Sequence, residues 1–110
     1  MEININDFTT DNTDPTGTSL QGYLTVSYAD LVKKLGKPTN DFDDSKSDAA
    51  WNIRWDDGVI ATIYNWKNGK NYRGPRGLKT ENILHWNVGG LTNGVEVDRL
   101  GQLFRSPIKE

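Results

Sequence analysis

The 110-residue chain contains no cysteine, one histidine and one methionine. Without cysteine it forms no disulfide bridge and has no thiolate nucleophile, and nothing indicates an oxidising compartment. No stretch approaches the roughly 20 apolar residues that a transmembrane helix needs. The first residues also lack the basic start and the apolar segment of a signal peptide. We therefore expect a cytoplasmic protein with no membrane partner.

Charge of one sign is missing from two segments. Residues 1–18 carry acidic side chains and no basic one, whereas residues 66–80 carry five basic side chains and no acidic one. The formal net charge of −2 argues against binding of duplex nucleic acid by a general basic surface. A local basic loop on a weakly acidic protein can still bind a small anion. The uneven distribution therefore points to residues 66–80.

Recognisable catalytic and metal motifs are also missing. The one histidine, His85, falls within a predicted strand, where a hydrogen-bonded structural role is the commoner one, and no nucleophile elbow is present. The acidic loop with Asp41, Asp43, Asp44 and Asp48 lacks the glycine and the closing glutamate of a calcium-binding EF-hand. The glycine-containing segment 69–77 matches neither the Walker P-loop pattern nor the G-x-G-x-x-G pattern of dinucleotide-binding loops. We predict a non-enzymatic protein with no metal site and no cofactor.

Hydrophobic spacing predicts six regular elements. A strand over 20–26, with Leu20, Leu24 and Val26 on one face, leads to a helix capped by Ser27 and ended by Gly36. A hairpin over 51–66, a strand over 82–88 and a helix over 94–104 follow, the last with Asn93 and Glu96 as a capping box. The order β-α-β-β-β-α predicts an α+β fold, a small antiparallel sheet with a central hairpin and two short helices on one face.

The elements predict one domain. Residues 19–106 form it, residues 1–18 are expected to be a flexible N-terminal arm, and residues 107–110 a C-terminal tail. Within the arm, Ile3, Ile5 and Phe8 alternate loosely, so an added edge strand is an alternative for this segment.

The turn of the hairpin decides which aromatic side chains share a face. A three-residue Asp56-Asp57-Gly58 loop pairs Trp55 with Val59, whereas a two-residue Asp57-Gly58 turn pairs Trp55 with Ile60. The three-residue loop is favoured because it separates apolar from mixed residues, and such segregation fixes the register of a half-buried sheet. The inner face then holds Trp51, Ile53, Trp55, Val59, Ala61 and Ile63, and the outer face holds Asn52, Arg54, Ile60, Thr62, Tyr64 and Trp66.

The outer face is more apolar than simple solvent exposure explains, so we expect a ligand or another copy of the chain to cover it. The adjoining segment 64–76 has aromatic rings for stacking, cations for phosphate and amides, including Asn65 and Asn68, for base edges. The alternative is a solvated basic loop with Trp66 in the core. The predicted ligand-binding residues are Arg54, Tyr64, Trp66, Lys67, Asn71, Tyr72, Arg73 and Arg76.

Three segments resemble a widespread family of small bacteriophage proteins. They are KPT at 37–39, WNIRWDDGVIATIYNWKNGKNY at 51–72 and HWNVGG at 85–90. The family pattern has a G-x-P-T turn, a tryptophan-led hairpin that ends in ATIY-x-W-K, and a strand that ends in two glycines. The resemblance spans residues 20–104. One departure is the order His85-Trp86, where the family has tryptophan before histidine, which argues against a role for His85.

The chain looks like the group that includes anti-CBASS sponge proteins, which sequester cyclic-nucleotide immune signals without degrading them. This resemblance implies a phage protein that acts in the cytoplasm of an infected bacterium. It also implies a homo-oligomer, a dimer or tetramer, with a cyclic oligonucleotide bound at subunit junctions. The alternative is a protein inhibitor of a host defence complex, similar to an anti-CRISPR protein, that docks through the exposed hairpin face.

Overall fold

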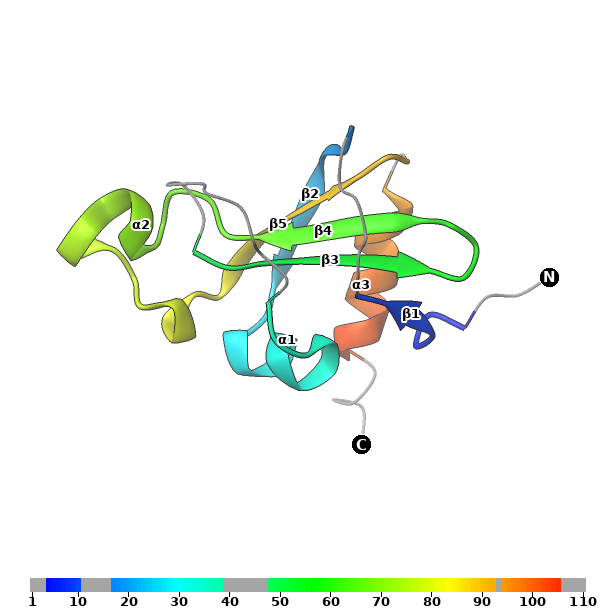
Figure 1. The fold of residues 1–110 in the computed structure, drawn as a ribbon, viewed down its shortest axis with the longest axis horizontal. Coiled ribbons are helices and arrows are strands. Elements are labelled where there is room, and N and C mark those ends of the chain that lie inside the picture. Colours follow the sequence, from blue (N-terminus) through cyan, green and yellow to red (C-terminus); the bar gives the residue numbers. More distant parts are fainter. Residues whose placement is uncertain (1–3, 11–16, 39–47, 93, 106–110) are drawn as a thin grey trace.

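Five antiparallel strands form one sheet in the order β1-β3-β4-β5-β2 (Figure 1). This computed structural model describes residues 4–10, 17–38, 48–92 and 94–105. The strands are β1 (Phe8–Thr9), β2 (Ser19–Thr25), β3 (Ala50–Trp55), β4 (Ile60–Tyr64) and β5 (His85–Gly90). The helices are α1 (Tyr28–Leu35), α2 (Lys70–Arg73), η1 (Gly74–Arg76), η2 (Thr80–Asn82) and α3 (Val95–Arg105). The predicted α+β class is confirmed.

The hairpin β3–β4 has the predicted three-residue turn. Ile53 lies opposite Ala61 in the ladder, and the amide of Trp55 donates to the carbonyl of Val59 at 2.9 Å. Gly58 has a φ of 91°, the left-handed conformation that this turn requires. Of the predicted inner face, Val59 is half-buried and the other five side chains are buried. Hydrophobic segregation therefore selected the correct register.

Both main helices lie on this inner face of the sheet. The hydroxyl of Ser27 accepts a hydrogen bond from the amide of Asp30 at 3.1 Å, as predicted for the start of α1, and Gly36 ends the helix with a φ of 86°. Leu31 and Leu35 of α1 and Leu100 and Leu103 of α3 are buried against the strands. The sheet and these two helices therefore form two layers around one core.

The core contains three tryptophans whose ring N–H groups all find backbone acceptors. Trp51 Nε1 donates to the carbonyl of Gly36, Trp55 Nε1 to that of Ile5, and Trp86 Nε1 to that of Val26, each at 2.9 Å. Buried tryptophan needs such a partner because an unsatisfied N–H is costly. The rings thus contribute apolar area and also attach three loops to the sheet.

Strand β2 corrects one expectation. A bulge lies between Leu20 and Gly22, so Leu20 pairs with Gly89 and its side chain is 50% exposed. The extra residue reverses the alternation of faces, which is why Leu20 does not share the inner face with Leu24. The prediction that Leu20 shares a face with Leu24 and Val26 was wrong because a bulge leaves no clear mark in the hydrophobic pattern.

Residues 4–10, which the sequence analysis assigned to a flexible arm, contribute to the fold. Phe8 and Thr9 form β1 and pair with Trp55 and Arg54 of β3, the alternative that the spacing of apolar residues had left open. Ile5 and Phe8 pack against the core. The first edge of the sheet is therefore a two-residue strand.

Candidate functional site

The candidate site lies where β4 ends and the chain leaves the sheet. Residues 66–79, which we call the basic loop, project beyond the sheet at the end opposite the hairpin turn (Figure 1). The segment from Lys67 to Thr80 was expected to be a plain loop. It contains α2 and η1 instead, and Thr80 begins η2. The basic side chains are thus carried on short helical turns.

A buried amide anchors the base of this loop. Asn65 is 0% exposed, and its Oδ1 accepts hydrogen bonds from the amides of Asp48 at 2.7 Å and Ala49 at 3.0 Å. Its Nδ2 donates to Asp48 Oδ1 at 2.9 Å and to Asn68 Oδ1 at 3.0 Å. Asn65 and Asn68 had been expected to bind base edges. The side chain of Asn65 instead makes structural hydrogen bonds, and Asn68 accepts one of them.

Two glycines close the neck of the loop. Gly69 forms a bridge with Leu78, and the amide of Leu78 donates to the carbonyl of Asn68 at 3.0 Å. A Cβ atom on Gly69 would collide with the carboxylate of Asp48, and one on Gly77 would collide with the backbone of Gly69. Only glycine allows these close approaches. The loop therefore has a tightly fastened base.

Three aromatic rings and one cation gather beside this base. We call Tyr64, Trp66, Lys67 and Tyr72 the aromatic–lysine cluster. The rings of Tyr64 and Trp66 meet edge to face with centroids 6.1 Å apart. Lys67 Nζ lies 5.8 Å from the ring centroid of Trp66 and 5.4 Å from that of Tyr72, distances typical of cation–π contacts. Trp66 is 42% exposed and Tyr72 is 49% exposed, so the alternative that places Trp66 in the core was wrong.

Lys67 has a backbone conformation that lysine rarely adopts. Its φ is 62°, the only positive value among the non-glycine residues that the structure describes. The Nε of Arg73 donates to the Lys67 carbonyl at 2.8 Å and so helps to hold this conformation. A left-handed non-glycine residue costs on the order of 1 kcal/mol and is often found at a functional site. Lys67 thus combines an unusual backbone conformation with contacts to two aromatic rings.

The structure brings five of the eight predicted residues together. Arg73 joins the aromatic–lysine cluster through Lys67, and Arg76 is exposed on the adjacent η1. Arg54 lies elsewhere: it pairs with Ile60, next to the hairpin turn, and is four residues, about 13 Å, along β3 from the partner of Tyr64. The side chain of Asn71 lies outside the described residues. Arg54 is therefore separate from the loop.

Two further features lie away from the loop. His85 is exposed and stacks on Tyr23 with ring centroids 5.0 Å apart, on the outer face. A hollow of about 400 Å³ lies between β2 and α3, on the inner side of the sheet. Within residues 4–10, 17–38, 48–92 and 94–105 no group of three or more acidic, histidine or cysteine residues could hold a metal ion. Asp41, Asp43 and Asp44 lie outside these ranges.

Comparison with known proteins adds no relative. No protein-family model matches the chain, and no curated protein sequence is significantly similar to it. In the part of the chain that the structure describes, no helix has both the length and the apolar character needed to cross a membrane.

Proposed function

We propose that the protein binds a nucleotide-type second messenger on the basic loop and sequesters it without cleaving it. In this proposal the protein is a phage anti-defence protein that acts in the cytoplasm of the infected bacterium. The observation that carries the proposal is the aromatic–lysine cluster, in which a cation lies close to two exposed rings on a loop that has no acidic residue.

The chemistry of a nucleotide matches these groups. A base has a flat π face that stacks on tryptophan or tyrosine, and such stacking contributes about 1–3 kcal/mol per base. A phosphate accepts charge-assisted hydrogen bonds from lysine and arginine. Trp66 and Tyr72 would stack on a base, while Lys67, Arg73 and Arg76 would contact phosphate. The long Lys67 side chain can turn from the rings to the phosphate at little cost.

The resemblance to anti-CBASS sponge proteins supports the finer part of the proposal. It favours a cyclic oligonucleotide as the ligand and sequestration rather than hydrolysis as the action. It also favours a homo-oligomer in which the outer face of the hairpin, with Ile60 and Tyr64, meets another subunit. On this face Ile60 and Tyr64 are only half-buried within one chain.

Calorimetry with a panel of cyclic di- and trinucleotides and cyclic ADP-ribose tests the proposal. We expect heat of binding and ligand-dependent thermal stabilisation with at least one of them. Heating the complex should release the ligand intact, which separates a sponge from an enzyme that degrades the signal. No heat with any member of the panel would refute the proposal.

A matched pair of variants assigns the binding to the loop. Replacing Arg73 and Arg76 together with alanine should abolish the ligand-dependent stabilisation. Replacing the exposed Lys33 and Lys37 with alanine removes the same charge from the region of α1 and should leave it unchanged. If neither pair affects binding, the ligand lies elsewhere. If the protein binds no nucleotide but blocks a purified defence complex, the inhibitor alternative replaces the sponge.

A further inference from the structure

The two edges of the sheet differ in how well they are protected against pairing with another strand. The β1 edge has only two residues and follows the acidic Asp7. The β2 edge has seven residues, and the surrounding segment 17–27 contains neither a charged residue nor a proline. Short length, charge, proline and β-bulges are the usual protections of an edge strand. Among them β2 has only the bulge near Leu20.

The backbone of β2 presents hydrogen-bonding groups to the open side. Among the described strands β2 pairs only with β5, and the amide of Val26 donates to the carbonyl of Leu84 at 3.0 Å. In an antiparallel ladder the direction of these groups alternates from residue to residue. The N–H and C=O groups of Tyr23 and Thr25 therefore point away from β5. They form a short template for one further strand.

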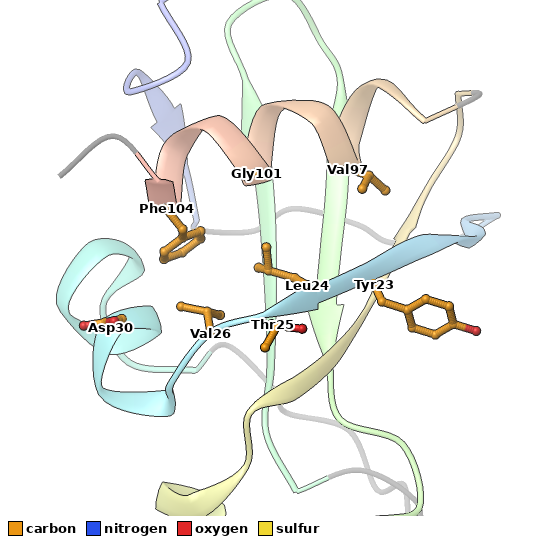
Figure 2. Close-up of a pocket in the computed structure, with 8 residues that line it drawn as sticks. All are labelled: Tyr23, Leu24, Thr25, Val26, Asp30, Val97, Gly101 and Phe104. Atoms are coloured by element: carbon orange, nitrogen blue, oxygen red, sulfur yellow. The ribbon is translucent and has the colours of Figure 1, made fainter. Parts of the chain in front are cut away.

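A hollow lined by both apolar and polar residues accompanies this open edge. Figure 2 shows Leu24 of β2 and Val97 and Phe104 of α3 directed toward the same space, while Tyr23 points away from α3. Gly101 faces the hollow from the middle of α3, where glycine costs the helix about 1 kcal/mol relative to alanine. Among the described residues that line the hollow, Asp30 is the one charged residue and none is basic. The hollow is therefore a poor site for an anionic ligand.

We infer that the β2 edge is an interface at which a second copy of this chain adds its own β2, antiparallel, about a two-fold axis. Because segment 17–27 is uncharged, two copies of it meet without repulsion between like charges. The two-fold arrangement also brings the two hollows together. Val97 and Phe104 of one copy are then buried against the same residues of the other copy. The sheet then continues through both copies. One type of contact thus satisfies the backbone groups and fills both hollows.

This interface is independent of the proposed nucleotide site. Strand β5 lies between β4, which leads into the basic loop, and the edge strand β2. It is also distinct from the outer hairpin face. A failure to bind nucleotides therefore says nothing about pairing through β2, and the reverse also holds.

Sedimentation velocity of the full chain from about 1 to 200 µM tests the inference, since mass action makes the dimer depend on concentration. We expect a concentration-dependent dimer. Thr25→Pro removes one outward N–H and leaves the ladder bonds of β2 to β5 intact, because proline is tolerated on the open side of an edge strand. It should weaken the dimer at least about tenfold. Thr25→Val retains the N–H and nearly the same shape, and should not weaken it.

A second variant keeps the test decisive if Thr25→Pro disturbs the fold. Gly101→Leu should fill the hollow and favour helix formation, so the free energy of unfolding stays equal or rises while the dimer weakens at least about tenfold. Thr9→Lys, on the β1 edge, is the matched control and should leave the dimer unchanged. A monomer at all concentrations, or a dimer that only Ile60 or Trp66 variants weaken, would overturn the inference. A β2 edge that pairs only with an added peptide would do the same.

Discussion

Both ends of the central hairpin are held to other parts of the fold, but by different kinds of interaction. At the turn, Asp57 forms a bidentate ion pair with Arg99 of α3, with N–O distances of 3.0 and 2.6 Å, near the surface. At the open end, the neutral amide of Asn65 makes four hydrogen bonds with described residues in a fully buried position. The basic loop with the proposed ligand site lies beside the second kind of anchor.

This difference indicates which end of the hairpin contributes more to the stability of the fold. An exposed ion pair contributes little to the free energy of unfolding because water screens the charges and two side chains must be ordered. Each hydrogen bond of a buried amide contributes modestly to stability. Removing the amide, however, leaves buried donors and acceptors without partners. The ion pair at the turn does have one additional contact, since the Arg99 guanidinium lies 5.2 Å from the ring centroid of Trp55. We therefore expect the open end to be the more sensitive of the two.

The largest effect is expected for Asn65→Leu. This change removes both acceptor and donor functions and leaves the buried amide of Ala49 without a partner. The free energy of unfolding should fall by about 2–4 kcal/mol in urea titrations. Asn68→Ala removes one of the four hydrogen bonds and should cost less. Equal losses for the two variants would contradict the assignment of Asn65 as the central anchor.

Glu96→Gln separates burial from charge, because Glu96 is charged like Asp57 but 0% exposed like Asn65. Its carboxylate accepts hydrogen bonds from the amides of Leu91 and Thr92, each at 3.0 Å, and from the Thr92 hydroxyl at 2.6 Å. Loss of the charged acceptor should lower the free energy of unfolding by about 1–3 kcal/mol. Glu81→Gln, at an exposed position, is the control. A loss no greater than that of the control would show that burial does not matter here.

Lys67→Asn tests whether the strained backbone conformation at the open end of the hairpin serves ligand binding. Asparagine tolerates the left-handed conformation better than lysine does, so the free energy of unfolding should stay equal or rise by up to about 1 kcal/mol. The same change removes the cation between Trp66 and Tyr72, so the thermal shift produced by the nucleotide should shrink. Lys70→Asn, in the same loop, is the control for loss of one charge. A gain in both stability and binding would contradict a functional role for the strain.

The smallest effect at neutral pH is expected for Asp57→Asn at the turn, and it should shrink further in high salt. The hydrogen bond from Arg99 is the largest cause that lowers the pKa of Asp57 below its usual 3.8. For Glu96, burial alone would raise the pKa, but the Thr92 hydroxyl and several backbone amides together lower it below its usual 4.5. A lowered pKa means that the folded state favours the carboxylate, so this stability is present above these usual values and is lost as the pH falls through the folded pKa values.

Urea titrations between about pH 6 and pH 2 measure how the free energy of unfolding falls as the pH is lowered. Glu96→Gln should flatten the fall in stability more than Asp57→Asn does, because its carboxylate is the buried one. If Asp57→Asn flattens it more, the ranking of the two carboxylates is reversed.

Much of the fold could be predicted from local patterns. Ser27, Gly36 and the spacing of Tyr28, Leu31 and Leu35 predicted α1, because capping and side-chain periodicity act within a few residues. The Asp56-Asp57-Gly58 turn set the register of the hairpin for the same reason. The capping box at Asn93 lies outside the described residues, while Glu96 accepts hydrogen bonds from residues that precede it.

The site was less predictable because it depends on contacts between distant segments. Asn65 was expected to bind a ligand, and only its approach to Asp48, 17 residues earlier in the chain, makes it an anchor. Arg54 was grouped with the loop because it shares a face with Tyr64, but position along the strand separates them. Alternation predicts the face of a side chain and leaves its neighbours along the sheet undetermined.

By itself, the sequence determined the class of the fold, the turn of the hairpin and the composition of a basic, aromatic loop, because short-range sterics and hydrophobic periodicity suffice for these. Only the tertiary structure decided that Lys67 lies close to both Trp66 and Tyr72, that Asn65 is buried, and that β2 is an open edge of the described sheet beside a hollow. These features arise when segments far apart in the chain pack together, and packing decides which polar groups are buried and which edge is left open.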